Sequence, residues 1–266
     1  MLLVIDVGNT TIVFGVYKDK ELVHDFRIST VKTRTSDEYG LLFYNTLSHS
    51  NIDPKDIDNV IISSVVPNLM HTLPSMVIKY FNQQPMIVSQ DLKLGLEIDY
   101  HNPKEVGADR IVNAVAALQL YGGPCIIIDI GTAMTFCVVN GAKHYVGGLI
   151  MPGIGISAEA LFMRTSKLPK IEIIKPQDLV GKSTVSSMQS GLYYGFTLMI
   201  DSIIERILKE QDWNVDEVNI ISTGGFSSLL TGDSRYDITI NRYLTLEGLR
   251  MIFEMNQRNH LRKHQG

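Results

Sequence analysis

The sequence is poor in cysteine, in long apolar runs and in excess positive charge. Its 266 residues include two cysteines, Cys125 and Cys137, each inside an apolar run, which indicates buried thiols in a reducing compartment rather than a disulfide framework. No uninterrupted apolar stretch approaches the roughly 20 residues that span a bilayer. The formal net charge is −4. We therefore expect neither nucleic acid nor a membrane as a partner.

We expect no targeting segment at the start of the sequence. The first Met leads directly into the apolar residues 2–5, without a basic segment or a small-residue cleavage site. We therefore expect a cytoplasmic protein. Basic residues gather only in residues 258–264, where we expect a solvated, frayed terminus.

What the sequence does contain is a repeated pattern of strand, Asp-x-Gly turn and strand. The first copy occupies residues 2–17 around Asp6-Val-Gly-Asn-Thr10, and the second occupies residues 125–139 around Asp129-Ile-Gly-Thr-Ala133. An internal repeat of this kind usually means a duplicated fold with two equivalent loops facing each other. With 45% hydrophobic residues, the chain has enough material for two compact lobes, which we place at residues 1–115 and 116–266.

Hydrophobic periodicity predicts the remaining elements of an α/β layered fold. Helices are expected after Ser36, a candidate N-cap, and at 69–81, 111–118, 187–210 and 245–258. Further strands are expected at 22–28, 60–65, 85–88, 143–146 and 218–222, with an Asn140-Gly141 hairpin turn before the fourth of these.

An Asp-x-Gly turn between two strands suits phosphate binding. Glycine lets the backbone N–H groups approach a phosphate, and the aspartate can hold Mg²⁺ through water or position a monovalent ion. The hydroxyls of Thr10, Thr11 and Thr132 would add donors. A single turn of this kind is more often an ordinary hairpin. Two matched copies and a further Thr223-Gly224-Gly225 turn favour function by about four to one.

Two other motifs resemble nucleotide-binding sequences but lack the residues or elements that such sites need. Gly181-Lys-Ser-Thr184 resembles the end of a Walker A loop, but that motif needs glycine where Pro176 stands. Gly153-Ile-Gly155-Ile-Ser-Ala158 imitates a dinucleotide fingerprint, but it lacks the βαβ unit and the acidic residue that such a site needs.

A third motif, Gly107-Ala-Asp109-Arg110, precedes the helical run 111–118. Taken alone, the pair of charges is more often a helix cap with a surface salt bridge. A kinase for an alcohol, however, needs a carboxylate that takes the hydroxyl proton and a fixed cation near the anionic substrate. Asp109 and Arg110 fit both needs.

Together these motifs resemble the type III pantothenate kinases, members of the acetate and sugar kinase, heat-shock chaperone and actin superfamily. The resemblance covers nearly the whole chain and also includes Ser64-Val-Val-Pro67 and Gly147-Gly-Leu-Ile-Met-Pro-Gly153. It implies two duplicated ribonuclease H-like (actin-like ATPase) lobes, with mixed five-stranded sheets flanked by helices. It also implies transfer of the γ-phosphate of ATP to the primary hydroxyl of pantothenate, the first step of coenzyme A synthesis, by a homodimer.

The resemblance also implies roles for individual residues. Asp109 would accept the proton, Asp6 would lie near Mg²⁺, and Asp129 would bind the required monovalent cation, K⁺ or NH₄⁺. The ATP-binding residues would be Asp6, Val7, Gly8, Asn9, Thr10, Thr11, Ile12, Val13, Thr132, Gly224 and Gly225. The pantothenate-binding residues would be Tyr100, Gly107, Ala108, Asp109, Arg110 and Thr184.

The chain departs from the family at two positions. Position 11 is Thr where relatives often have Asn, and position 137 is Cys where many have Asp. The second departure concerns the expected cation site: if the Asp of those relatives helps to ligate a cation, Asp129 must act without it here. Two alternatives remain open: another small-molecule kinase or phosphatase of the same fold, and a regulator that has lost catalysis. Intact Asp109 and two intact phosphate loops argue against the second.

Overall fold

The computed structural model describes residues 1–263 and divides into two compact units. Residues Met1–Ala116 form the first unit together with the described chain from Leu244 onward, and Ala117–Tyr243 form the second. The sequence motifs assign the last helix to the second lobe. In the structure that helix, α7 (Leu244–Lys263), belongs to the first unit, because its apolar residues pack on the sheet of that unit. The units are therefore not consecutive in the chain.

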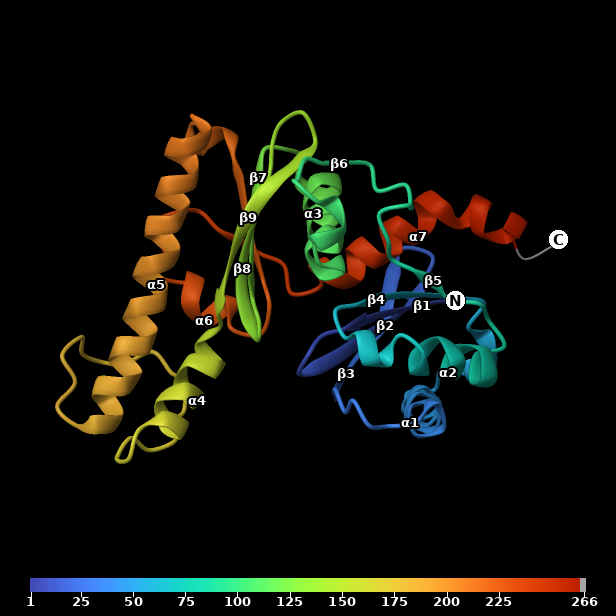
Figure 1. Ribbon diagram of the computed structural model, residues 1–266, viewed down its shortest axis with the longest axis horizontal. Helices are drawn as coiled ribbons and strands as arrows, with labels where there is room; N and C mark the ends of the chain where they lie inside the picture. The colour runs from blue at the N-terminus through green and yellow to red at the C-terminus, as the bar shows by residue number, and fades with distance from the viewer. Residues whose placement is uncertain (264–266) are drawn as a thin grey trace. The chain divides into compact units, whose positions relative to one another are not determined.

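The first unit is a mixed sheet with helices on both faces (Figure 1). Its strand order is β3-β2-β1-β4-β5, with β1, β2 and β3 antiparallel and with β4 and β5 parallel to β1. The helices α1 and α2 cover one face and α7 packs on β1, β2 and β4. The strands of this sheet are β1 (Leu2–Val7), β2 (Thr11–Lys18), β3 (Glu21–Ser29), β4 (Asn59–Ser64) and β5 (Met86–Ile87). The helices are α1 (Ser36–His49), α2 (Thr72–Phe81) and α3 (Ala108–Tyr121), which runs into the second unit. The short strand β6 (Glu97–Ile98) is not part of this sheet.

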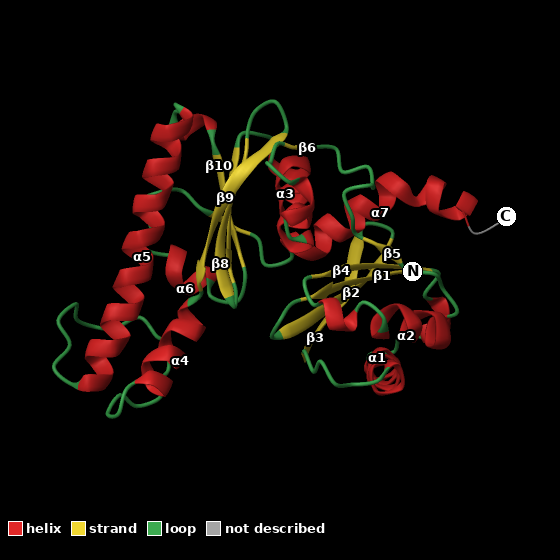
Figure 2. Cartoon of the chain, viewed as in Figure 1, coloured by secondary structure: helices red, strands yellow, loops and turns green. Residues whose placement is uncertain are grey.

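The second unit repeats this arrangement. Within residues 117–243 the strand order is β11-β10-β7-β8-β9, in which β7, β8 and β9 are antiparallel and β10 and β11 are parallel to β7. Figure 2 shows β8, β9 and β10 among the strands of this sheet, in yellow. The elements are β7 (Cys125–Ile130), β8 (Ala133–Val139), β9 (His144–Pro152), α4 (Ile154–Arg164), α5 (Thr184–Gln211), β10 (Asn219–Thr223), α6 (Ser227–Thr231) and β11 (Thr239–Ile240).

The repeat extends to an irregularity of the strands. The pairing shifts register between Val16 and Tyr17 on β2, and it shifts between Val138 and Val139 on β8. These positions correspond, because Tyr17 lies opposite the first residue of β1 and Val139 lies opposite the first residue of β7. The duplicated fold predicted from the two Asp-x-Gly turns is confirmed.

Three local predictions differ from the structure. The N-cap of α1 is Thr35 rather than Ser36, because Thr35 and Glu38 form a reciprocal capping box. The expected Asn-Gly hairpin turn is a longer loop, in which Asn140 Oδ1 accepts the N–H of His144 and Lys143 adopts a φ of 67°. The helix α4 has no counterpart in the predicted elements.

Other predictions hold within the described residues. Cys125 and Cys137 are buried free thiols, as expected from their apolar surroundings. Among residues 1–263, no helix is long and apolar enough to cross a membrane. The helix α7 continues to Lys263, beyond the end expected near Arg258. The side chains of the basic cluster at 258–264 lie outside the described residues.

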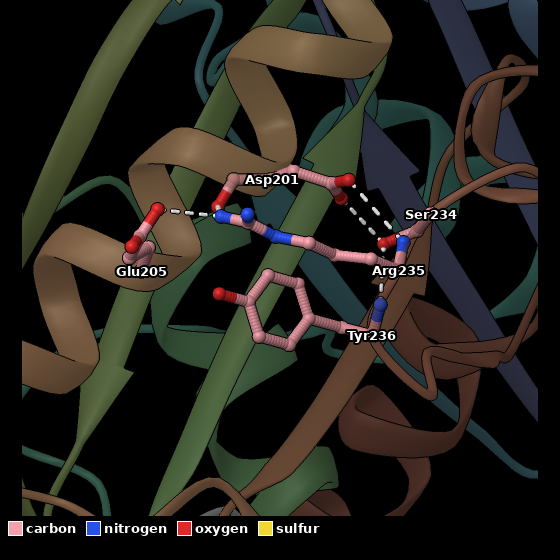
Figure 3. A network of polar contacts seen from close by, with 5 residues as sticks. All are labelled: Asp201, Glu205, Ser234, Arg235 and Tyr236. Atoms are coloured by element: carbon pink, nitrogen blue, oxygen red, sulfur yellow. Dashed lines mark hydrogen bonds and ion pairs between the residues drawn. The ribbon is translucent and has the colours of Figure 1, made fainter.

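A polar network fastens the segment between α6 and β11 to the long helix α5 (Figure 3). The Asp201 carboxylate on α5 accepts hydrogen bonds from the Ser234 hydroxyl at 2.5 Å and from the Arg235 backbone N–H at 3.2 Å. The Arg235 guanidinium reaches Glu205, one helical turn further along α5, at 2.5 Å. This segment follows the Gly224-Gly225 turn, so the network helps to fix the chain on one side of that turn.

Candidate active site

The first Asp-x-Gly turn closes the β1–β2 hairpin. Gly8 donates its N–H to the Thr11 oxygen at 3.0 Å, and the Thr30 hydroxyl donates to the Gly8 oxygen at 2.7 Å. Asp6 is partly buried at the end of β1, whereas Asn9 and Thr10 are exposed at the tip. The turn is thus fixed at its base and open at its tip, which suits the binding of a phosphate.

The residues 6–13 do not all present side chains to this opening. Val7 and Ile12 are fully buried in the apolar core of the first unit. They can therefore reach a ligand only through their backbone atoms. Thr11 and Val13 are partly buried.

The second Asp-x-Gly turn is one residue shorter. Val7 pairs with Ile12 across the first turn, whereas Ile130 pairs with Met134 across the second. Gly131 donates its N–H to the Ala133 oxygen at 3.1 Å, and Thr132 is exposed. The two turns therefore have the same type of hydrogen bond after the aspartate but differ in length by one residue.

The Gly224-Gly225 turn lies against this second turn. Gly224 has a φ of 92°, and a Cβ added there would lie 2.7 Å from Asp129 Oδ1 and 2.6 Å from the Ile130 oxygen. Only glycine permits this approach without strain. The structure thus brings Asp129 and Gly224 together, although they are far apart in the sequence.

Asp129 is flanked by hydroxyl residues on both neighbouring strands. Thr135 on β8 and Thr223 on β10 are its register partners. Side chains in register share a face of the sheet, so carboxylate and hydroxyl oxygens gather there, and such oxygens suit a hard cation. No group of three or more His, Cys, Asp and Glu side chains that could hold a metal occurs in the part of the chain described by the structure.

Cys137 lies further from the turn than Thr135, opposite Ile127. It is 2% exposed, and its sulfur accepts a hydrogen bond from the Tyr145 hydroxyl at 3.6 Å. Its surroundings are those of a core residue.

Asp109 lies in the first turn of α3. Its Oδ1 accepts the backbone N–H of Arg110 at 2.8 Å. Burial raises the pKa of the Asp109 carboxyl above its ordinary value, and the N–H and charge of Arg110 oppose this rise. Arg110 itself is buried.

The other expected substrate residues lie in both units. Tyr100, partly buried, precedes α3, and Ala108 is the first residue of that helix. Thr184 is the exposed first residue of α5 in the second unit. The turn before it is a capping box in which Ser183 accepts the N–H of Ser186, which agrees with our rejection of a Walker A loop.

The repeated strand order, with an Asp-x-Gly turn after each central strand, defines the duplicated ribonuclease H-like fold of actin-like kinases. Solved structures agree on the fold. A candidate 2-dehydro-3-deoxygalactonokinase from Sinorhizobium meliloti has a TM-score of 0.62 at 11% identity, covering 95% of both chains. A candidate Baf family transcriptional activator from Campylobacter jejuni has a TM-score of 0.60 at 16% identity, covering 96% of this chain and 99% of its own.

Sequence comparisons identify the family of the chain. The model of the type III pantothenate kinase family matches residues 2–206. A type III pantothenate kinase of Finegoldia magna is 53% identical over 257 residues, which cover 97% of this chain and 98% of that protein. The chain belongs to the type III pantothenate kinase family.

The contact between Gly107 and Asp109 yields a test of the site. A Cβ on Gly107 would lie 2.5 Å from Asp109 Oδ1, so Gly107→Ala must displace the carboxylate rather than the backbone. We expect kcat to fall about 10- to 100-fold, since small misplacements of reacting groups are costly. The melting temperature should change little.

The matched control is Gly141→Ala, an exposed turn position where an added Cβ meets only Pro124 at 3.9 Å. It should keep both kcat and the melting temperature. Steady-state kinetics and thermal unfolding of the two variants measure the difference. Full activity of Gly107→Ala would show that the position of the Asp109 carboxylate is unimportant.

Proposed function

We propose that this chain transfers the γ-phosphate of ATP to the primary hydroxyl of pantothenate and so begins coenzyme A synthesis. Membership of the type III pantothenate kinase family and the identity to the Finegoldia magna enzyme support this activity. The observation that carries it is Asp109, a carboxylate with a raised pKa, in the same unit as the Asp6 turn. A kinase for an alcohol needs such a group.

The two Asp-x-Gly turns would hold ATP. The first would contribute residues 6–13, with Val7 and Ile12 acting through their backbone because their side chains are buried. The second would contribute Thr132 and the Gly224-Gly225 turn. Asp6 would hold Mg²⁺ through water, with the phosphates as further ligands. When bound, the ion neutralises charge on the transferred phosphoryl group.

Asp109 would orient the pantothenate hydroxyl and accept its proton. Even with a raised pKa, a carboxylate is a far weaker base than an alkoxide, so it cannot deprotonate the hydroxyl at the start of the reaction. In a loose transition state the proton moves late, after the bond to ADP has weakened. Most of the acceleration would then come from positioning and electrostatics.

Pantothenate would be bound by Tyr100, by Gly107–Arg110 and by Thr184. Arg110 is buried, so it would act mainly as a fixed positive charge beside Asp109. The exposed hydroxyl of Thr184 is available for a direct hydrogen bond.

Asp129 would bind the monovalent cation, K⁺ or NH₄⁺. The flanking hydroxyls of Thr135 and Thr223 support the proposal, because they supply neutral oxygen ligands beside one carboxylate. Cys137, buried against Tyr145, is not needed for this site.

A homodimer is also proposed. Among the described residues, eleven of the seventeen exposed large hydrophobic side chains lie between Leu149 and Leu198 in the second unit. Met163 at 67% exposure and Val180 at 76% are examples. Apolar surface concentrated in this way is typical of a subunit interface.

The substrate is tested by a coupled ADP-release assay. We expect ADP production that depends on pantothenate, with no comparable rate on acetate or simple sugars, because fold alone does not determine substrate. A higher rate on one of the other acceptors would favour another kinase of this fold. The absence of turnover on every acceptor would favour a regulator without catalysis.

Asp109→Asn tests the proton acceptor. The amide cannot take the proton, so we expect kcat to fall about 10²-fold or more, with little change in ATP affinity. The raised pKa of Asp109 also determines the pH dependence. As the pH falls, kcat/KM should decrease when the carboxylate becomes protonated, and the pKa of this decrease should lie above 3.8, the ordinary value for Asp. That decrease should be absent from the residual activity of the variant. A near-normal kcat would remove Asp109 from the role.

Asp129→Ala tests the cation site. Because the carboxylate supplies the only full negative charge proposed for that site, its removal should abolish activation by K⁺. Rates with K⁺, NH₄⁺ and Na⁺ at constant ionic strength measure the effect. Thr132→Ala is the comparison: as a phosphate contact, it should raise the KM for ATP and keep the activation by K⁺. Retained activation in Asp129→Ala would place the ion elsewhere.

A further inference from the structure

Ser63 occupies a distinctive position beside the first Asp-x-Gly turn. It lies on β4, the parallel neighbour of β1, and its register partner is Asp6. Register partners on neighbouring strands present their side chains on the same face, with the strands about 4.8 Å apart. The Ser63 hydroxyl therefore lies next to the Asp6 carboxylate.

The hydroxyl of Ser63 has no hydrogen-bond partner, although the residue is fully buried. Its neighbour Ser64 differs, because the Ser64 hydroxyl accepts the N–H of Val66 at 3.1 Å. A buried polar group without a partner destabilises the fold, whereas a methyl group at the same place would not. Such a group is often found where function needs it.

The second unit repeats the arrangement independently. Thr223 on β10 is the register partner of Asp129, as Ser63 is of Asp6, and it is also buried. Both turns thus have a small hydroxyl residue on the neighbouring parallel strand, beside the carboxylate.

We propose that Ser63 is a positioning residue for Asp6, and that its hydroxyl donates a hydrogen bond to the Asp6 carboxylate in the complex with Mg²⁺ and nucleotide. The inference rests on the proposed function, because it assigns Asp6 to the metal. A carboxylate that serves a metal through water must be held in one orientation, and a hydroxyl donor from the surrounding shell does this. The buried surroundings of Ser63 strengthen such a bond.

A second serine hydroxyl with these properties provides a control. Ser222 is also fully buried and has no hydrogen-bond partner. Its register partner is Ile128, an apolar core residue, rather than a carboxylate. Ser222 and Thr223 are consecutive in a strand, so their side chains lie on opposite faces of the sheet.

The experiment compares Ser63→Ala, Ser63→Thr and Ser222→Ala with the unaltered protein. The melting temperature is measured without ligand, and Mg²⁺-dependent binding of ADP is measured by calorimetry without pantothenate. For Ser63→Ala we expect an unchanged or higher melting temperature and about tenfold weaker Mg²⁺-dependent binding, the usual range for such a partner. Ser63→Thr keeps the hydroxyl, so it should bind ADP with Mg²⁺ as the unaltered protein does. Ser222→Ala should also leave this binding unchanged.

Two results would overturn the proposal. One is unaltered Mg²⁺-dependent binding in Ser63→Ala, whether or not its melting temperature falls. The other is equal weakening in Ser63→Ala and Ser222→Ala, which would indicate a general effect of core substitutions. Pantothenate turnover by the unaltered protein is measured separately. If that turnover fails while ADP still binds with Mg²⁺, the proposed function is wrong and the binding comparison still decides the role of Ser63.

Discussion

The parallel pairing of each central strand with its neighbour is the constraint on which the rest of the molecule depends. β1 pairs with β4 and β7 pairs with β10, and both central strands have an aspartate as their next-to-last residue, just before a turn. Parallel strands need a crossover connection, which here contains α1 in the first unit and α4 and α5 in the second. The turns can therefore remain short and polar while the buried strands and crossovers supply the stability.

The duplication yields two sites that are related but unequal. Asp6 has Val13 and Ser63 as register partners, whereas Asp129 has Thr135 and Thr223. The second carboxylate thus has hydroxyl neighbours on both sides, and the first has one on a single side. This difference in oxygen donors supports our separate proposals of Mg²⁺ at the first turn and of a monovalent cation at the second.

The carboxylate that we propose as catalytic, Asp109, is positioned differently, at the start of a helix. Asp109 is held by the backbone of its own helical turn and is partly withdrawn from water, which raises its pKa. Gly107 leaves room for it. The two Asp-x-Gly turns and the proposed proton acceptor are thus positioned by separate local structures, which is consistent with one fold serving many substrates.

The sequence alone determined the duplicated strand–turn–strand pattern, the buried thiols and most strands and helices, because apolar periodicity and turn residues are local signals. It also located Asp6, Asp129 and Asp109 within recognisable motifs. Only the tertiary structure decided that α7 joins the first unit, that Gly224 lies against Asp129, and that Ser63 lies beside Asp6. These relations connect residues distant in the chain. The register of parallel strands and the packing of helices on a sheet determine them, and no local pattern encodes either.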